Sequence, residues 1–112
     1  MKVLKFGGTS VGSAENIQRV KEILMGQNDH VIVVVSALGG ITDKILSAAK
    51  MAAIGTGYFQ AELTEINTRH FETIDKLFER ERRNEVKEKV QLLLDELGRI
   101  IHVFLRPFFK VH

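Results

Sequence analysis

The most restrictive feature of this sequence is an uninterrupted run of five β-branched residues at 31–35, Val-Ile-Val-Val-Val. A run of this kind without polar alternation is typical of a strand that is covered on both faces in a parallel sheet, and it predicts that the strand is not an edge. A shorter apolar run over residues 3–6 predicts a second strand. Two such strands in the first third of the chain favour an α/β fold.

Each predicted strand ends in a glycine turn that leads into a helical pattern. Gly7 and Gly8 follow the first strand, and Thr9, Ser10 and Ser13 offer N-cap hydroxyls for a helix that ends near Gly26. The turn at 36–40 follows the second strand and leads to a helix through about residue 52, for which Thr42 and Asp43 are cap candidates. Residues 1–55 therefore predict a βαβα start to a right-handed, doubly wound parallel sheet.

Residues 56–104 predict a pair of long helices that pack together. In the first helix an apolar stripe consists of Leu63, Ile66, His70, Ile74 and Leu77. In the second helix a seam with alternating spacings of four and three consists of Val86, Val90, Leu93, Leu97, Ile100 and Phe104, with Leu94 and Ile101 beside it. Residues 105–112 match none of these patterns and are left as an unplaced tail.

Composition narrows the function classes. A formal net charge of +2 over 112 residues predicts no strong field for nucleic acid. The sequence has no cysteine, which removes disulfides, thiolate zinc sites and a cysteine nucleophile. The four histidines are scattered at His30, His70, His102 and His112, so we expect no metal site. No apolar run reaches the roughly 20 residues of a membrane span, and we expect a cytoplasmic protein with a modest core.

The two glycine turns are the candidate functional elements, because open α/β sheets bind ligands at the carboxyl ends of their strands. In the first turn, Lys5 supplies a charge and the glycines allow close backbone approach, a combination that suits a polyphosphate. The P-loop pattern is absent, because the lysine precedes the glycines. In the second turn Ser36, Gly39, Gly40 and Thr42 offer neutral donors to an anion. A purely structural role remains an alternative for both turns, and no nucleophile stands out.

Two longer strings carry a family resemblance. Lys-Phe-Gly-Gly-Thr-Ser-Val at residues 5–11 resembles the amino-terminal signature of the aspartate kinases, and Val-Val-Ser-Ala-Leu-Gly-Gly-Ile-Thr-Asp at 34–43 is similar to the second turn of that family. The opening Met-Lys-Val-Leu-Lys-Phe-Gly-Gly resembles the type that is fused to homoserine dehydrogenase. The resemblance covers residues 1–55 well and the helical pair in general style. It implies the start of the αβα sandwich of the amino-acid kinase fold, with residues 1–112 as the amino-terminal part of a catalytic domain.

The resemblance also implies an activity, namely phosphorylation of the L-aspartate side-chain carboxylate by MgATP to give 4-phospho-L-aspartate, the first step toward lysine, threonine and methionine. In this reading Lys5 neutralises the ATP phosphates and the charge of the transition state, and Gly7, Gly8 and Thr9 contact phosphate. Ser36 and Thr42 line the aspartate site. The implied cofactors are ATP and Mg²⁺, with no metal ligand assigned in this chain, and the full-length protein is expected to be a homo-oligomer.

The chain also departs from the family pattern. A Ser-Phe-Gly-Glu-Arg-like segment, whose acid contacts aspartate in the family, and the nucleotide-base elements are absent from these 112 residues. We therefore expect neither pocket to be complete and the chain alone to have negligible kinase turnover. Two alternatives stay open: a noncatalytic binding or assembly module that uses the helical pair, and another acyl-phosphate-forming amino-acid kinase.

Overall fold

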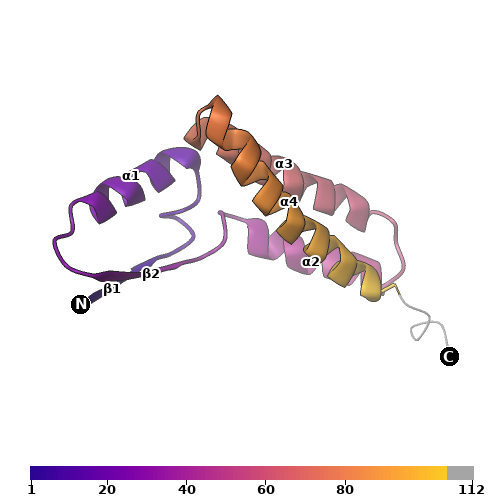
Figure 1. Cartoon of the computed structure of the whole chain (residues 1–112). Helices are drawn as coiled ribbons and strands as arrows, with labels where there is room; N and C mark the ends of the chain where they lie inside the picture. The colour runs from indigo at the N-terminus through magenta and orange to yellow at the C-terminus, as the bar shows by residue number, and fades with distance from the viewer. Residues whose placement is uncertain (106–112) are drawn as a thin grey trace. The chain divides into compact units, whose positions relative to one another are not determined.

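The computed structural model of the chain describes residues 1–105, which form two strands and four helices (Figure 1). In chain order these are β1 (Lys2–Phe6), α1 (Ala14–Met25), β2 (Val31–Val35), α2 (Ile41–Ala53), α3 (Phe59–Leu77) and α4 (Arg80–Val103). The chain divides into two compact units, Met1–Thr42 and a second that begins at Asp43. The expectation of one modest core is therefore replaced by two units, and each is described by itself below.

The N-terminal unit is a parallel β-α-β arrangement, as predicted. β1 and β2 pair in register from Lys2 opposite Val31 to Phe6 opposite Val35. α1 covers one face of this two-stranded sheet, and a small core forms where side chains of the sheet, the first turn and the helix meet (Figure 1). Its buried members are Phe6, Val11 and Val20, with Leu4, Ile17 and Leu24 packed against them.

The prediction that β2 is covered on both faces is wrong for this part of the chain. The exposed fractions of its side chains are 47% for Ile32, 40% for Val33, 45% for Val34 and 57% for Val35. Residues 1–105 give β2 one partner strand and one covering helix, so the strand is an edge. β-branched residues favour extended backbone, and the side chains of β2 are exposed within the described part of the chain.

The helix boundaries follow the capping rules in part. The Ser13 side chain accepts a hydrogen bond from the Asn16 backbone N–H at 3.2 Å and caps α1, as predicted. Gly26 caps the other end in a right-handed conformation. α2 begins at Ile41, whose N–H bonds to the Leu38 carbonyl at 3.0 Å. Thr42 and Asp43 therefore lie in the first turn of α2, two and three residues after the N-cap position at Gly40, and their prediction as caps is wrong.

The second unit contains the predicted helical pair, α3 packed against α4 (Figure 1). Four side chains of α3 are buried: Phe59, Leu63, Ile66 and Ile74. On α4 the buried residues are Leu94 and Ile101, whereas Leu93 and Ile100 of the predicted seam are 70% and 51% exposed. The seam prediction is therefore wrong for Leu93 and Ile100, whereas Val86, Val90 and Leu97 of the seam are half-buried. The run Leu92-Leu93-Leu94 offers three adjacent faces to a partner helix, and α3 packs against the last of them.

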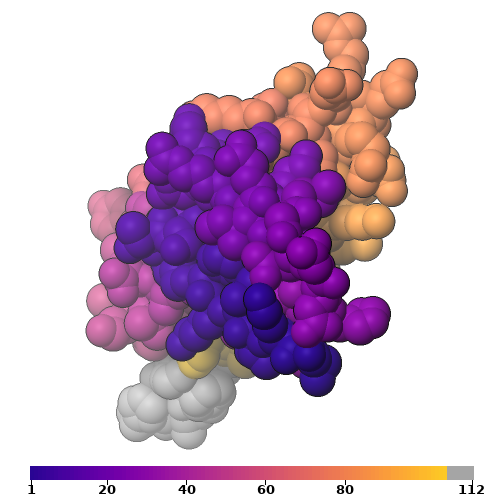
Figure 2. Space-filling model, turned by 90° about the vertical axis from the view of Figure 1, so that its left-hand side faces the viewer, coloured from indigo at the N-terminus to yellow at the C-terminus, as the bar shows by residue number. Residues whose placement is uncertain are grey.

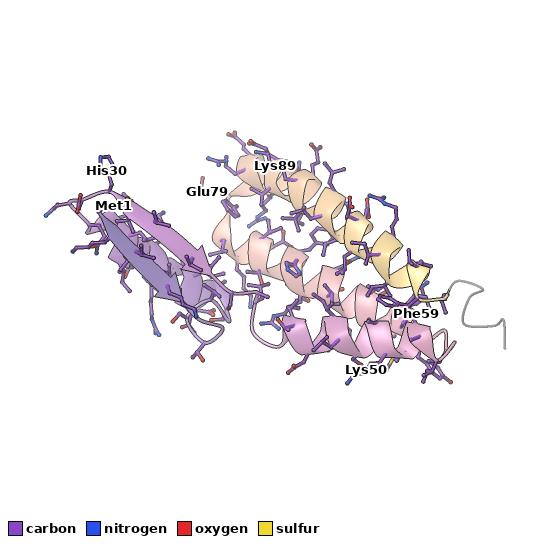
Figure 3. All side chains as sticks on the ribbon, turned by 90° about the horizontal axis from the view of Figure 1, so that it is seen from below. Met1, His30, Lys50, Phe59, Glu79 and Lys89 are labelled. Carbon is purple, nitrogen blue, oxygen red and sulfur yellow. The ribbon has the colours of Figure 1, made fainter. Side chains whose placement is uncertain are left out.

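Ion pairs on the surface tie the helices of this unit to one another. The Lys44 ammonium on α2 pairs with the Glu65 carboxylate on α3, which raises the pKa of Lys44. The Lys87 ammonium on α4 lies 2.7 Å from the Asp75 carboxylate of α3 and lowers the pKa of Asp75. In Figure 3, Glu79 marks the connection between α3 and α4, and Lys89 lies further along α4. No helix within residues 1–105 is long and apolar enough to cross a membrane.

Candidate functional site

The two glycine turns predicted from the sequence lie side by side in the N-terminal unit. The Ser36 N–H donates to the Phe6 carbonyl at 3.2 Å, which continues the strand pairing into the turns. A Cβ added to Gly8 would lie 3.6 Å from the Ser36 hydroxyl oxygen. The parallel register therefore brings Gly8 and Ser36 together although 27 residues separate them in sequence. Figure 2 presents the surface of this unit in indigo and purple.

The first turn is tightly wound. The Val11 N–H donates to the Gly7 carbonyl at 3.2 Å, and the Gly12 N–H donates to the Thr9 carbonyl at 3.3 Å. A Cβ on Gly12 would lie only 2.9 Å from the Gly8 carbonyl oxygen, a separation that real Cβ atoms essentially never show. The turn therefore needs glycine at position 12 for reasons of space. This glycine was not singled out from the sequence.

The same turn leaves backbone donors free. Within residues 1–105, the N–H groups of Gly8, Thr9 and Ser10 have no hydrogen-bond partner in the protein. All three residues are exposed, and nothing lies within 4 Å of where a Cβ on Gly7 would be. Consecutive unpaired N–H groups in an open turn are well suited to bind an anion, because each can donate a hydrogen bond to it.

Lys5 adds a positive charge at the end of β1, immediately before this turn. Leu4 and Phe6 pack with the core under α1, so alternation along the strand directs the exposed Lys5 to the opposite face. Among the ion pairs of the described residues, none uses the Lys5 ammonium. Its charge is available to a ligand.

The second turn is open as well. The Ser36 hydroxyl is exposed and donates to the neighbouring Ala37 carbonyl at 3.0 Å. Gly40 has a φ of +79°, a left-handed conformation that favours glycine, and it precedes α2 directly. Thr42 is exposed in the first turn of α2. The structure brings Ser36 next to Gly8 of the first turn. Thr42 lies six residues later in the sequence, on α2.

Asn16 is a residue of this region that sequence reasoning missed. Its side-chain Nδ2 donates to the Thr9 carbonyl at 2.8 Å, and its Oδ1 accepts from Arg19 Nη1 at 3.2 Å. A cavity of about 320 Å³ lies beside these groups. It is lined by Phe6, Thr9, Ser10, Asn16, Arg19, Val20 and Ile23. The only sequence signal was the position of Asn16 three residues after a candidate N-cap serine.

A second, larger cavity of about 640 Å³ lies in the helical unit between α3 and α4. His102 is on its wall, where its Nδ1 lies 2.7 Å from the Gly98 carbonyl oxygen and its Nε2 lies 3.1 Å from the Gln60 amide. The ring also meets Phe59 edge-on, with centroids 5.1 Å apart. These contacts give His102 a packing role. Residues 1–105 contain no group of three or more His, Asp or Glu side chains that could hold a metal ion, and His112 lies outside the described residues.

Comparison with known proteins identifies the class of this chain. The model of the amino acid kinase family matches residues 1–105, and the chain belongs to that family. The solved structure of Escherichia coli aspartokinase III, in complex with lysine and aspartate in its T-state, superimposes with a TM-score of 0.80 and 26% identity. The match covers 94% of this chain and 22% of that one. It confirms the predicted α/β fold.

Curated relatives point to one branch of the family. The chain is 56% identical over 52 residues to the aspartokinase of Geobacillus stearothermophilus and 55% identical over 51 residues to aspartokinase 2 of Bacillus subtilis. Each match covers 43% of this chain and 12% of the relative, so the chain spans a small part of the length of these proteins. The resemblance to the aspartate kinases read from residues 5–11 and 34–43 is thereby confirmed.

Proposed function

We propose that the two turns are the phosphate-binding and aspartate-binding elements of an aspartate kinase, which phosphorylates the side-chain carboxylate of L-aspartate with MgATP. One observation carries the proposal: three consecutive unpaired N–H groups, of Gly8, Thr9 and Ser10, follow the strand that bears the unpaired Lys5. The curated relatives that match this chain are aspartokinases, which favours aspartate as the acceptor.

The proposed reaction is a direct phosphoryl transfer. A carboxylate oxygen of the aspartate side chain forms a bond to the γ-phosphorus of ATP, while the bond from that phosphorus to the bridging oxygen breaks. The products are 4-phospho-L-aspartate and ADP, whose departing oxygen takes up the negative charge. Such a reaction asks the protein for positioning and charge stabilisation, and it needs no protein nucleophile.

The roles of the individual residues follow from their places. Lys5 neutralises phosphate charge as a point cation, and the turn of Gly7, Gly8 and Thr9 offers its backbone to the phosphate oxygens. Ser36 and Thr42 line the aspartate site with their hydroxyl groups. We propose that Mg²⁺ arrives on the ATP phosphates, a mode of binding that requires few protein ligands.

The rest of the proposal concerns the protein to which this segment corresponds. Residues 1–112 form the amino-terminal part of a kinase catalytic domain: 1–55 contribute the two turns and 56–104 the helical pair. The protein works in the cytoplasm as a homo-oligomer. Because 12% of a relative's length is covered, we expect the 112-residue chain alone to form negligible ADP. Aspartate-dependent ADP formation by the purified chain would contradict this last expectation.

The proposed phosphate site is tested by the affinity of the chain for MgATP, measured by isothermal titration. Lys5→Ala should weaken binding about 10- to 100-fold, because hydrogen bonds to charged groups are worth about 1.5–3 kcal/mol. Lys2→Ala is the matched control, since Lys2 is an exposed lysine at the other end of β1. It should change the affinity less than twofold. Equal losses in the two variants would contradict the proposal.

A further inference from the structure

We propose that Asn16 is a positioning residue that sets the conformation of the phosphate turn. The inference rests on the proposed function, since it concerns how the same turn holds its free N–H groups toward phosphate. It is carried by hydrogen bonds and close contacts within the N-terminal unit. None of these involves Ser36 or Thr42, the two residues assigned to aspartate.

Asn16 takes part in three hydrogen bonds, one of which joins the turn to α1. Its backbone N–H donates to the capping Ser13 hydroxyl at 3.2 Å, which fixes Asn16 in the first turn of the helix. From there its Nδ2 reaches back to the Thr9 carbonyl at 2.8 Å. Its Oδ1 accepts from Arg19 Nη1 at 3.2 Å. Because Arg19 can only donate, it leaves the NH₂ end of the amide to face Thr9.

The hold on the Thr9 carbonyl determines where the next N–H points. The peptide bonds of the described chain are all trans, so the Ser10 N–H points opposite to the Thr9 C=O within one rigid plane. The Thr9 carbonyl is directed at Asn16 and also accepts from the Gly12 N–H at 3.3 Å. The Ser10 N–H is therefore directed away from α1.

The preceding peptide plane follows the same logic. The Gly8 carbonyl oxygen faces Gly12, at 2.9 Å from where a Cβ of that residue would lie. The Thr9 N–H, which shares a plane with that carbonyl, is then directed away from Gly12. Two successive donors thus point away from the loop interior because the carbonyls of their peptide planes face the inside. Asn16 supplies the shorter of the two bonds that occupy the Thr9 carbonyl.

The test uses Asn16→Asp in the whole 112-residue chain. The substitution keeps the size of the side chain and its bond to Arg19, and a carboxylate is favourable in the first turn of a helix, so α1 should remain folded. It replaces the donor that faces Thr9 with an acceptor. Gln18→Glu is the matched control, because it makes the same charge change at an exposed position of α1. Asn16→Ala is a second variant that removes the donor without adding charge.

The first readout is the hydrogen exchange of the Gly12 amide, which bonds to the Thr9 carbonyl. We expect it to quicken about 2- to 10-fold in both Asn16 variants and to stay unchanged in Gln18→Glu. The second readout is the affinity for MgATP, which should fall about 2- to 10-fold in the Asn16 variants relative to Gln18→Glu. A merely structural role in α1 would instead quicken exchange along the helix and would not single out Gly12.

The outcomes separate the two proposals. Unchanged exchange at Gly12 in both Asn16 variants would overturn the positioning role, and so would unchanged affinity with faster exchange. Quicker exchange at Gly12, together with equal MgATP affinities of Lys5→Ala and Lys2→Ala, would support the hold of Asn16 on the turn and contradict the proposed function.

Discussion

The two units of this chain are held together by different means. In the N-terminal unit the strands, the turns and α1 are joined by main-chain and Asn16 hydrogen bonds and by close contacts at glycine, while four of five β2 side chains are exposed. In the helical unit the largest fully buried side chains, Ile66 and Ile101, lie on α3 and α4. Backbone geometry therefore sets the candidate site, and apolar burial sets the helical pair.

The largest expected effect breaks the helical unit at its seam. Leu94→Ala should lower the free energy of unfolding by about 2–5 kcal/mol, because it deletes a buried side chain and leaves a cavity. Leu93→Ala, one residue away and 70% exposed, should change it by less than about 0.5 kcal/mol. Urea unfolding followed by helical circular dichroism measures both. Equal losses of unfolding free energy in the two variants would support the seam through Leu93 that the sequence predicts.

A smaller effect is expected at the N-terminal unit. Ser13→Ala removes the side chain that caps α1 and should cost about 0.5–2 kcal/mol. Amide hydrogen exchange in α1 measures this loss locally. Ser47→Ala, inside α2, is the control and should cost nothing, because alanine is the better helix former. Protection in α1 that survives Ser13→Ala would show that burial, and not the cap, holds this helix.

The smallest expected effect is a difference between the two units in how their stability depends on pH. The lowered pKa of Asp75 means that its pair with Lys87 stabilises the helical unit above pH 3.8, and this stabilisation is lost as the pH falls below that value. The raised pKa of Lys44 gives stabilisation below pH 10.5 that is lost as the pH rises through the folded value. These groups are exposed, so solvent screening keeps both contributions small.

The stability of the N-terminal unit should fall at acid pH, because the group with a shifted pKa in this unit is the carboxylate of Asp29. The amino group of Met1 lies 2.7 Å from the Asp29 carboxylate and lowers its pKa, at the end of the sheet where Met1 and His30 are labelled in Figure 3. Unfolding at a series of pH values checks this, with Asp75→Asn and Lys44→Met as variants of the helical unit. Asp75→Asn should reduce the loss of stability of the helical unit at acid pH. Lys44→Met should reduce its loss of stability at alkaline pH. If the loss of stability at alkaline pH is the same in Lys44→Met, the pair of Lys44 with Glu65 is not its cause.

Much of the fold could be predicted from local chemistry. The β-branched run and the glycines mark where strands end, and the rule that parallel strands share their carboxyl edge placed Gly8 near Ser36. The burial of Leu94 in place of Leu93 could not be predicted, because Leu92, Leu93 and Leu94 are adjacent and only the partner helix selects among them. The exposure of β2 depends on the layers that surround it, and residues 1–105 supply one partner strand and one covering helix.

The candidate site was predictable to a similar depth. Lys5 and the glycines follow from residue type and place, whereas Asn16 acts through a bond to a main-chain carbonyl seven residues earlier. Such a bond depends on the path of the loop, and no spacing rule for side chains reveals it. The lack of space for a side chain at Gly12 also depends on the path of the loop, since it arises from the carbonyls of Gly8 and Thr9.

The in-register pairing of Lys2–Phe6 with Val31–Val35 has a consequence for how such a sequence can change over generations. Adding or deleting one codon in either strand would shift the following turn by about 3.3 Å and turn alternate side chains to the other face. Lys5 would then trade places with a core residue, and Gly8 would lose its position beside Ser36. Length changes should therefore be purged from these ten positions and tolerated in the connection between α2 and α3.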